Sequence, residues 1–218
     1  YSAHTPFLKA AVYAKRKDPR IKICLVVLDL PQYMNLSKKQ SMLYKIAKKY
    51  DINQFQQLNK MVDSYVLLTA PMKEVLDIHN RPYIILEGIV KTSELLMSYA
   101  DTSNGVRKSI LYAGALYERY GVKTLIDSLT LIKDEGLKLV ICGRGDLEDY
   151  IKNVANKDPR IFYKGQVTPE EVKELMNSVD LLVNPRPNNE IYTRYSFPSK
   201  NIEYLLSGKP VLGYKLDG

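Results

Sequence analysis

Short apolar runs alternate with longer, more polar stretches along the whole chain. Eight runs have the aliphatic and β-branched composition that is typical of strands: IKICLVVLDL, SYVLLTA, YIILEG, SILYAG, LKLVICG, RIFYKG, DLLVNP and KPVLGY. The stretches between them predict helices at about 7–16, 38–50, 71–79, 121–135, 146–156, 168–178 and 198–207. Strands that alternate with helices predict parallel sheets with crossover helices, so we expect an α/β fold.

Two of these helices carry clear end signals. Thr168 is followed by Pro169 and, three positions after Thr168, by Glu171, which together predict a capping box with proline at the first helical position. Pro198 disfavours helical backbone before it, so the last helix is expected to begin there. Gly208 follows that helix as a stop signal.

The stretch 91–107 separates two groups of predicted strands. It has no strand pattern and ends in a polar Ser-Asn-Gly cluster, as expected of a passage between two α/β units. The strand count on each side predicts two Rossmann-like domains, both incomplete, in residues 1–90 and 108–218. Because the chain starts without Met and ends just after a strand-like run, we expect an internal piece of a longer protein.

The composition indicates a folded protein and excludes an integral membrane protein. The chain has 218 residues, of which 45% are hydrophobic and 26% charged, enough for one large core or two small ones. No apolar run approaches the ~20 residues of a membrane-spanning helix. Cys24 and Cys142 lie far apart inside apolar runs, which favours reduced core thiols over a disulfide or a metal site.

The positive charge is concentrated in the first half of the chain. Residues 1–107 carry 16 basic and 9 acidic side chains, whereas the rest carries 16 and 15. Residues 37–50 contain five lysines, no acid and an apolar helical stripe, which favours either packing on a core or docking on an anionic membrane surface. The tyrosines lack the paired aromatic signature of RNA-binding sheets, so we expect no nucleic-acid partner.

Glycines follow two of the predicted strands, where α/β sheets commonly hold phosphates. Gly114 ends SILYAG and would let a ligand approach backbone N–H groups, although a plain tight turn would need glycine as well. Gly143 and Gly145 follow LKLVIC, but Glu148 replaces the third glycine of a dinucleotide fingerprint. This departure argues against a dehydrogenase.

The predicted helix start at residue 198 has the chemistry of an anion site. The first-turn N–H groups of Ser199, Lys200 and Asn201 would lack intrahelical partners, and the lysine adds a positive charge. Glu203 lies one turn further on the same face, where its carboxylate could accept hydrogen bonds from vicinal hydroxyls of a sugar ring. The alternative is an exposed ion pair between Lys200 and Glu203, and spacing leaves both open.

Six motifs follow one another in the second half of the chain: YAG (112–114), YG (120–121), ICGRG (141–145), YKGQVTPEEV (163–172), DLLVNPR (180–186) and FPSKNIEYLLSGKPVL (197–212). Together they resemble the donor-binding domain of retaining family 4 glycosyltransferases of the GT-B fold, in the form found in bacterial capsule and exopolysaccharide clusters. Upstream, YSAHTPFLKA and ILEGIV resemble a strand end of the acceptor domain and the strand before the interdomain linker. The resemblance thus makes residues 1–90 the second half of the acceptor domain.

The resemblance implies a role for several residues. Glu203 resembles the glutamate that holds the donor ribose, and Gly114, Ser199 and Lys200 lie where the diphosphate should pass. The segment 165–168 resembles the loop whose backbone meets the nucleobase. In that loop the resemblance implies Gly165 and Val167, and it places Arg186 near the donor pocket. His4 resembles the acceptor-domain histidine that touches the transferred sugar. The alternative for His4 is a histidine whose hydrogen bonds are satisfied at the end of a strand.

The sequence also departs from the family pattern. Many members carry two glutamates separated by seven residues, yet Tyr195 stands eight positions before Glu203. Contacts to the transferred sugar are therefore left to Glu190, Ser196 or the main chain of Phe197. Ala115 and Tyr120 replace the usual arginine and lysine after the first glycine, and Arg119 and Lys200 are the candidate replacements for their phosphate contacts.

The function implied by the resemblance is retaining transfer of a sugar from a nucleoside diphosphate to a saccharide or lipid-linked acceptor in polysaccharide biosynthesis. Such enzymes usually need no metal, and we expect no cofactor because His4 and His79 are isolated. A cytoplasmic location at the inner face of the membrane would suit the basic stretch 37–50. The alternatives are a non-catalytic or truncated nucleotide-sugar-binding protein and a GT-B sugar-nucleotide epimerase.

Overall fold

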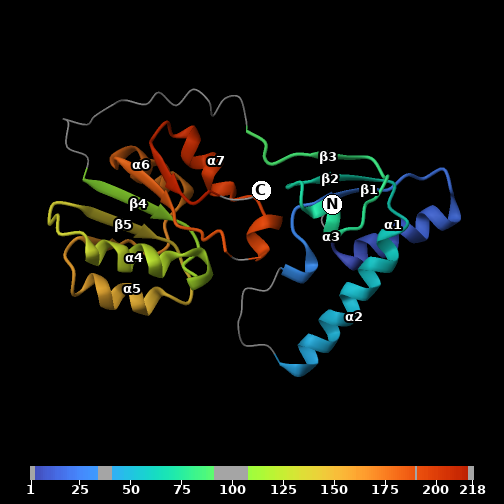
Figure 1. Cartoon of the computed structure of the whole chain (residues 1–218), viewed down its shortest axis with the longest axis horizontal. Coiled ribbons are helices and arrows are strands. Elements are labelled where there is room, and N and C mark those ends of the chain that lie inside the picture. Colours follow the sequence, from blue (N-terminus) through green and yellow to red (C-terminus); the bar gives the residue numbers. More distant parts are fainter. Residues whose placement is uncertain (1–2, 34–40, 91–107, 190, 216–218) are drawn as a thin grey trace. The chain divides into compact units, whose positions relative to one another are not determined.

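The computed structural model describes residues 3–33, 41–90, 108–189 and 191–215. The chain forms two compact units (Figure 1). Unit 1 contains the chain up to Ile89 together with Ile191–Phe197, and unit 2 contains Val90–Glu190 together with Pro198–Leu216. The linker that we predict at 91–107 lies outside the described residues.

Unit 1 is built on a three-stranded parallel sheet in the order β1-β2-β3. Its elements are α1 (Thr5–Lys17), β1 (Cys24–Val27), η1 (Pro31–Tyr33), α2 (Met42–Asn59), β2 (Ser64–Leu67), α3 (Met72–Val75) and β3 (Tyr83–Ile85). The central strand β2 pairs with both neighbours, with Val66 opposite Val26 and Ile84. Inward residues of β1, β2 and α1 form one apolar core that includes Leu8, Val12, Leu25, Val27 and Leu67.

The first half of α2 extends beyond this sheet (Figure 1), and its apolar side chains are exposed. Met42 is 79% exposed, Leu43 80% and Ile46 60%, whereas Phe55 in the second half of the helix is buried. The apolar stripe predicted in 37–50 therefore faces solvent over its described part, residues 41–50. Packing of that stripe on a core, one of the two alternatives for this stretch, is not what the structure shows.

Unit 2 contains a five-stranded parallel sheet in the order β6-β5-β4-β7-β8. Its elements are β4 (Ser109–Ala113), η3 (Glu118–Tyr120), α4 (Val122–Leu131), β5 (Lys138–Cys142), α5 (Glu148–Ala155), β6 (Ile161–Tyr163), α6 (Pro169–Ser178), β7 (Leu181–Asn184), α7 (Ser199–Leu206) and β8 (Val211–Gly213). Helices α4 and α5 cover one face of the sheet, and α6 and α7 cover the other (Figure 1). The prediction of an α/β fold with parallel sheets is confirmed, and all eight predicted strands are present.

Local signals explain where the helices of unit 2 begin and end. The capping box of α6 is present, since Glu171 N–H donates to Thr168 Oγ1 and Thr168 N–H donates to the Glu171 carboxylate. Gly208, with φ of 70°, follows the last turn of α7. Helix α7 itself begins one residue later than predicted, because Pro198 takes the N-cap position with ψ of 85°.

The two cysteines have different surroundings. Cys142 is buried at the end of β5, as its apolar run predicts, and it is a free thiol. Cys24 is also free but exposed, because it stands at the first position of β1, which is an edge strand in the described sheet. The prediction of a core position was therefore wrong for Cys24.

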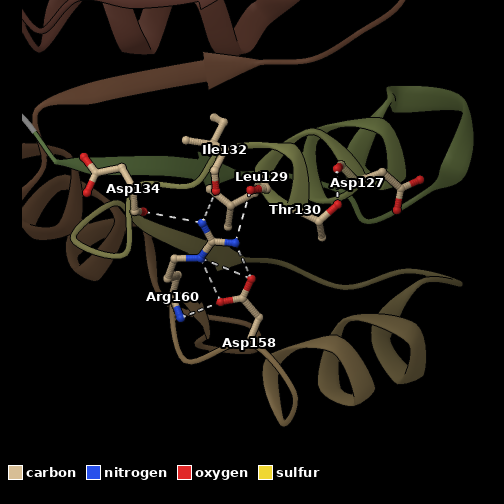
Figure 2. A network of polar contacts seen from close by, with 7 residues as sticks. All are labelled: Asp127, Leu129, Thr130, Ile132, Asp134, Asp158 and Arg160. Atoms are coloured by element: carbon tan, nitrogen blue, oxygen red, sulfur yellow. Dashed lines mark hydrogen bonds and ion pairs between the residues drawn. The ribbon is translucent and has the colours of Figure 1, made fainter.

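Arg160 joins the start of β6 to the end of α4 (Figure 2). Its guanidinium donates to the carbonyl oxygens of Ile132 (2.6 Å) and Leu129 (3.2 Å) and to both carboxylate oxygens of Asp158. The side chains of Arg160 and Asp158 are only 14% and 17% exposed. The same five letters, KDPRI, stand before β1, but there the Arg20 side chain is 90% exposed, and among the described residues it bonds only Asp18.

We expect Arg160→Met to lower the unfolding temperature by several degrees and to flatten its dependence on pH. The hydrogen bonds from Arg160 hold the pKa of Asp158 below its usual value. A carboxyl group whose pKa is lower in the folded state than in the unfolded state stabilises the fold at pH values above its pKa in the unfolded state. This stabilisation is lost as the pH falls through its pKa in the folded state. Thermal unfolding from neutral to acidic pH measures both effects. Arg20→Met is the matched control, and an equal effect of the two substitutions would contradict the expectation.

Candidate functional site

The strand order of unit 2 contains a topological switch point. From β4 the chain passes by α4 to β5 on one side, and β7 pairs with β4 on the other side. In open parallel sheets the crevice at the carboxyl ends of the two strands at such a point is where ligands bind. The loops after β4, β5, β6 and β7 therefore define the candidate site.

Three glycines meet at the carboxyl ends of β4, β5 and β6. Gly114 N–H donates to the Cys142 carbonyl at 3.0 Å, and Gly143 N–H donates to the Gly165 carbonyl at 2.8 Å. Gly143 has φ of +136°, and a Cβ placed there would lie 1.8 Å from the carbonyl oxygen of Gly114. Only glycine fits between these strands, so the loop backbones come close enough to share one ligand.

Gly121 brings the start of α4 against the end of β7. It has φ of +77°, and a Cβ placed there would lie 2.0 Å from the carbonyl oxygen of Pro185. Arg119, two residues earlier in η3, lies over the ring of Tyr120 at 5.7 Å. Arg186, which follows Pro185, is buried, with 9% of its surface exposed. Each of the two candidate arginines is thus within two residues, along the chain, of the Gly121–Pro185 contact.

Tyr204 fixes α7 to the end of β4. Its hydroxyl accepts from Ala113 N–H at 3.0 Å and donates to the Ala113 carbonyl at 3.2 Å. The ring is 1% exposed, and burial raises the pKa of the phenol. Asn184 Nδ2 donates to Asn201 Oδ1 at 2.6 Å and adds a bond from the end of β7 to the first turn of α7. The first turn of α7 is thereby held at the carboxyl end of β7.

The first turn of α7 offers two backbone donors and one cation. Ser199 and Lys200 donate their N–H groups to no other residue that the structure describes. Asn201 N–H donates to the Pro198 carbonyl at 2.8 Å, so the expectation of a third free donor was wrong. Burial raises the pKa of Cys142 to about 11, while the charge of Lys200 acts in the opposite direction. The lysine therefore lies within electrostatic reach of the end of β5.

Lys200 and Glu203 form an ion pair in this structure, with Nζ and Oε2 2.9 Å apart. Both side chains are about half exposed, at 41% and 51%. An exposed pair at this spacing contributes only about 0.2–0.5 kcal/mol. A ligand that supplies a phosphate to the lysine and hydroxyls to the glutamate could replace the pair at little cost.

The other candidate residues lie in three different places. Val167 follows Gly165 after β6 and packs partly against the core beneath α6. His4 is the exposed N-cap residue of α1, its ring edge toward Phe7 at 6.3 Å, and its side chain makes no capping hydrogen bond. Ser196 and Phe197 belong to unit 1, although we expected residues 108–218 to form one domain. Glu190 lies outside the described residues.

Among the residues that the structure describes, no group of three or more histidine, cysteine, aspartate or glutamate side chains is placed to hold a metal ion. No helix in the described ranges is long and apolar enough to cross a membrane.

Sequence reasoning missed the residues that position the site rather than line it. Tyr204 and Asn201 stand inside the recognised motif FPSKNIEYLLSGKPVL, and Asn184 inside DLLVNPR. A tyrosine at an inward position of a short helix is a signal for a buried hydroxyl that needs a partner. Its partner, the backbone of Ala113, is 91 residues away and carries no signal of its own.

The model of a known family, described as "Glycosyl transferases group 1", matches residues 107–218, just over half of the chain. A curated relative, an uncharacterized glycosyltransferase of Methanocaldococcus jannaschii, is 27% identical over 115 residues, which are 51% of this chain and 28% of the relative.

Solved structures share the fold at low sequence identity. The sucrose-phosphate synthase of Thermosynechococcus elongatus superposes with a TM-score of 0.64 and 16% identity, over 95% of this chain and 53% of that one. HepE of Anabaena, in complex with UDP, superposes with a TM-score of 0.61 and 15% identity, over 98% of this chain and 58% of HepE. A mutant of TarM from S. aureus was solved in complex with fondaparinux, α-GlcNAc-glycerol and UDP. It superposes with a TM-score of 0.58 and 16% identity, over 90% of this chain and 37% of TarM. The chain thus spans between about a quarter and three fifths of these proteins.

Proposed function

Because the chain belongs to the family of group 1 glycosyl transferases, we propose that it is the donor-binding part, and a portion of the acceptor-binding part, of a retaining glycosyltransferase. The enzyme transfers a hexose from a nucleoside diphosphate to a saccharide or lipid-linked acceptor in polysaccharide biosynthesis, as a member of family 4. The observation that carries the proposal is the convergence of the glycine turns and the first turn of α7 on the switch point of unit 2.

The diphosphate is bound by backbone donors and cations. Negative charge develops on the leaving diphosphate as the glycosidic bond breaks, and donors fixed in advance stabilise that charge without reorganisation. Ser199 and Lys200 supply two N–H groups at the positive end of α7, and the lysine supplies a full charge. Gly114 lets the phosphates approach the end of β4, and Arg119 or Arg186 adds a second cation. This arrangement needs no metal.

The nucleoside extends from the diphosphate toward the glycine loops. Glu203 leaves its ion pair with Lys200 and accepts hydrogen bonds from the two ribose hydroxyls. The backbone of 165–168, with Gly165 and Val167, meets the base. Two of the similar structures were solved with UDP, so we propose uridine as the base to test first.

The transferred sugar lies beyond the diphosphate, and its contacts come from Glu190, Ser196, Phe197 or His4. The leaving phosphate oxygen takes the acceptor proton, so no side chain is assigned as a general base. Titration of the chain with UDP, GDP, CDP and ADP tests the donor site. Assays of sugar transfer and donor hydrolysis then separate a transferase from a binding protein, and appearance of an epimeric sugar nucleotide would identify an epimerase.

We also propose that α2 docks on an anionic membrane surface at the cytoplasmic face. The support is its exposed apolar stripe beside the lysines 45, 48 and 49. An amphipathic helix of this kind inserts its apolar face between headgroups while its cations meet anionic lipids.

Replacing Leu43 and Ile46 together by Ser should weaken binding to phosphatidylglycerol-containing vesicles by more than tenfold. Each apolar side chain that leaves water contributes about 1.5–3 kcal/mol, and both are exposed in the absence of a membrane. Vesicle sedimentation measures the effect. The control replaces Leu131 and Ile132, an exposed apolar pair of unit 2, by Ser. Equal binding by the two double variants, or no binding by the unsubstituted chain, would refute the docking.

A further inference from the structure

The turn Gly143–Gly145 follows β5 inside unit 2, and only its glycines have been given a role so far. It lies between Gly114, after β4, and Gly165, after β6, and Gly143 contacts both of them. The residue between the two glycines of the turn is Arg144, which is exposed. The turn therefore carries one cationic side chain at the carboxyl edge of the sheet.

Hydrogen bonds fix the backbone on which Arg144 stands. Its carbonyl oxygen accepts from Leu116 N–H at 2.8 Å, which joins it to the loop after β4. The carbonyl oxygen of the preceding residue, Gly143, accepts from the hydroxyl of Tyr163 at 3.1 Å, which joins the turn to the end of β6. The backbone of the arginine is thus held between the two neighbouring strands.

Glu148, which stands where a dinucleotide fingerprint would have its third glycine, fixes the other end of the turn. Its carboxylate accepts from Gly145 N–H at 3.2 Å. Burial, and next the negative charge of Glu148, raise the pKa of the Tyr163 phenol, whereas the positive charge of Arg144 lowers it. The guanidinium of Arg144 therefore lies within electrostatic reach of the Tyr163 hydroxyl at the end of β6.

The Arg144 side chain makes no hydrogen bond or ion pair with any residue that the structure describes. The other cations assigned to the donor site have different surroundings. Arg119 lies over the ring of Tyr120, Arg186 is buried, and Lys200 is held in an ion pair. Arg144 thus combines a fixed backbone with an exposed guanidinium whose donors are open to a ligand.

The strand order places Arg144 on the path of the proposed ligand. In the sheet, β5 lies between β6 and β4. The base is proposed to meet 165–168 after β6, and the diphosphate to meet Gly114 after β4 and the first turn of α7. A nucleoside diphosphate that contacts all of these loops passes the end of β5. A guanidinium at that point can bond two oxygens of one phosphate at once.

We propose that Arg144 binds a phosphate of the donor nucleotide where the ligand passes the end of β5. This role deepens the donor site and rests on the proposed function. Tyr163 and Glu148 hold the turn, so the cation is in place before the ligand binds. A cation fixed in advance meets the charge of the diphosphate without rearrangement of the loop.

Arg144→Gln should weaken the binding of UDP to the full chain about tenfold in isothermal titration. The substitution changes only an exposed side chain, so the unfolding temperature should stay the same. Lys173→Gln is the matched control, because Lys173 is an exposed cation on α6 that makes no polar contact to another described residue. It should leave the affinity unchanged. Equal affinities of Arg144→Gln and the unsubstituted chain would overturn the proposal.

Arg144→Lys tests whether the charge is what binds. It should recover at least threefold of the affinity that Arg144→Gln loses. Added salt should weaken the binding of UDP more in the unsubstituted chain than in Arg144→Gln, because salt screens a contact between charges. If the lysine recovers nothing, or if the two chains respond equally to salt, the arginine does not bind a phosphate and the proposal is wrong.

The unsubstituted chain separates this inference from the proposed function. If it is folded and binds none of the four nucleoside diphosphates, the proposed function fails, and the role of Arg144 fails with it. If it binds a diphosphate other than UDP, that diphosphate replaces UDP in the titrations. If it binds one of them and Arg144→Gln binds it equally well, only the role of Arg144 is overturned.

Discussion

Glu203→Gln is expected to weaken the binding of UDP by more than tenfold, about 1.4 kcal/mol at 25 °C. In the proposed complex the carboxylate of Glu203 accepts hydrogen bonds from the two ribose hydroxyls. A hydrogen bond to a charged group contributes about 1.5–3 kcal/mol. The amide of glutamine removes that charge. In the free chain the carboxylate has only an exposed ion pair with Lys200, so stability should hardly change. Isothermal titration with each of the four nucleoside diphosphates measures the effect.

Glu174→Gln is the matched control for this prediction. Glu174 is an exposed glutamate on α6 that makes no polar contact to another described residue. It carries the same charge and should leave the affinity unchanged. Equal affinities for Glu203→Gln and the unsubstituted chain would remove Glu203 from the donor site, and a base other than uracil would be identified by the diphosphate that does bind.

Gly143→Ala is expected to destabilise unit 2 by about 4 kcal/mol and to abolish nucleotide binding. The added Cβ would lie 1.8 Å from the Gly114 carbonyl oxygen, and the backbone has φ of +136°. Residues with side chains pay about 1–3 kcal/mol for such a conformation, and overpacking costs a further 1–3 kcal/mol. Because the obstacle is backbone, the strands themselves must separate. Urea unfolding followed by circular dichroism measures the loss.

Gly165→Ala separates the two causes of that loss. Gly165 also has a left-handed backbone, with φ of +71°, but a Cβ placed there would have no atom within 4 Å. Only the conformational cost remains, and we expect about 1 kcal/mol. If Gly143→Ala costs no more than Gly165→Ala, the close approach of the β4 and β5 loops does not constrain the site.

The elements of unit 2 could be predicted from the sequence because their signals are local. Each strand is a short aliphatic run, and Thr168 and Gly208 mark helix ends through contacts within a few residues. The candidate site could be proposed from the sequence for the same reason, since glycines at strand ends and a proline before a helix are local patterns. The detail at Asn201 was missed because its N–H bonds the Pro198 carbonyl, a turn closed by the exact path of the chain.

Features that depend on distant partners could not be predicted. Nothing near Tyr195 shows that it packs on Tyr33, because both lie in ordinary polar and aromatic surroundings in the sequence. The stripe on α2 has the same apolar spacing whether or not a core covers it, so exposure of Leu43 had to come from the structure. Cys24 and Cys142 both stand in apolar runs. Cys142 is buried because its strand β5 has a neighbouring strand on each side, whereas Cys24 is exposed on the edge strand β1 of the described sheet.

The segment Ile191–Phe197, which belongs to unit 1 although unit 2 precedes and follows it in the sequence, also constrains the order in which the chain can fold. The Thr69 hydroxyl donates to the carbonyl oxygen of Arg194, 125 positions further along the chain, so this contact of unit 1 forms only after most of unit 2 has been synthesised. Contacts this distant in sequence slow folding, because loop closure must precede the gain from the contact. During translation, residues 3–89 would leave the ribosome with the surface that receives Tyr195 still uncovered. A single cut after Ile89 would leave unit 2 whole but would separate Ile191–Phe197 from the rest of unit 1.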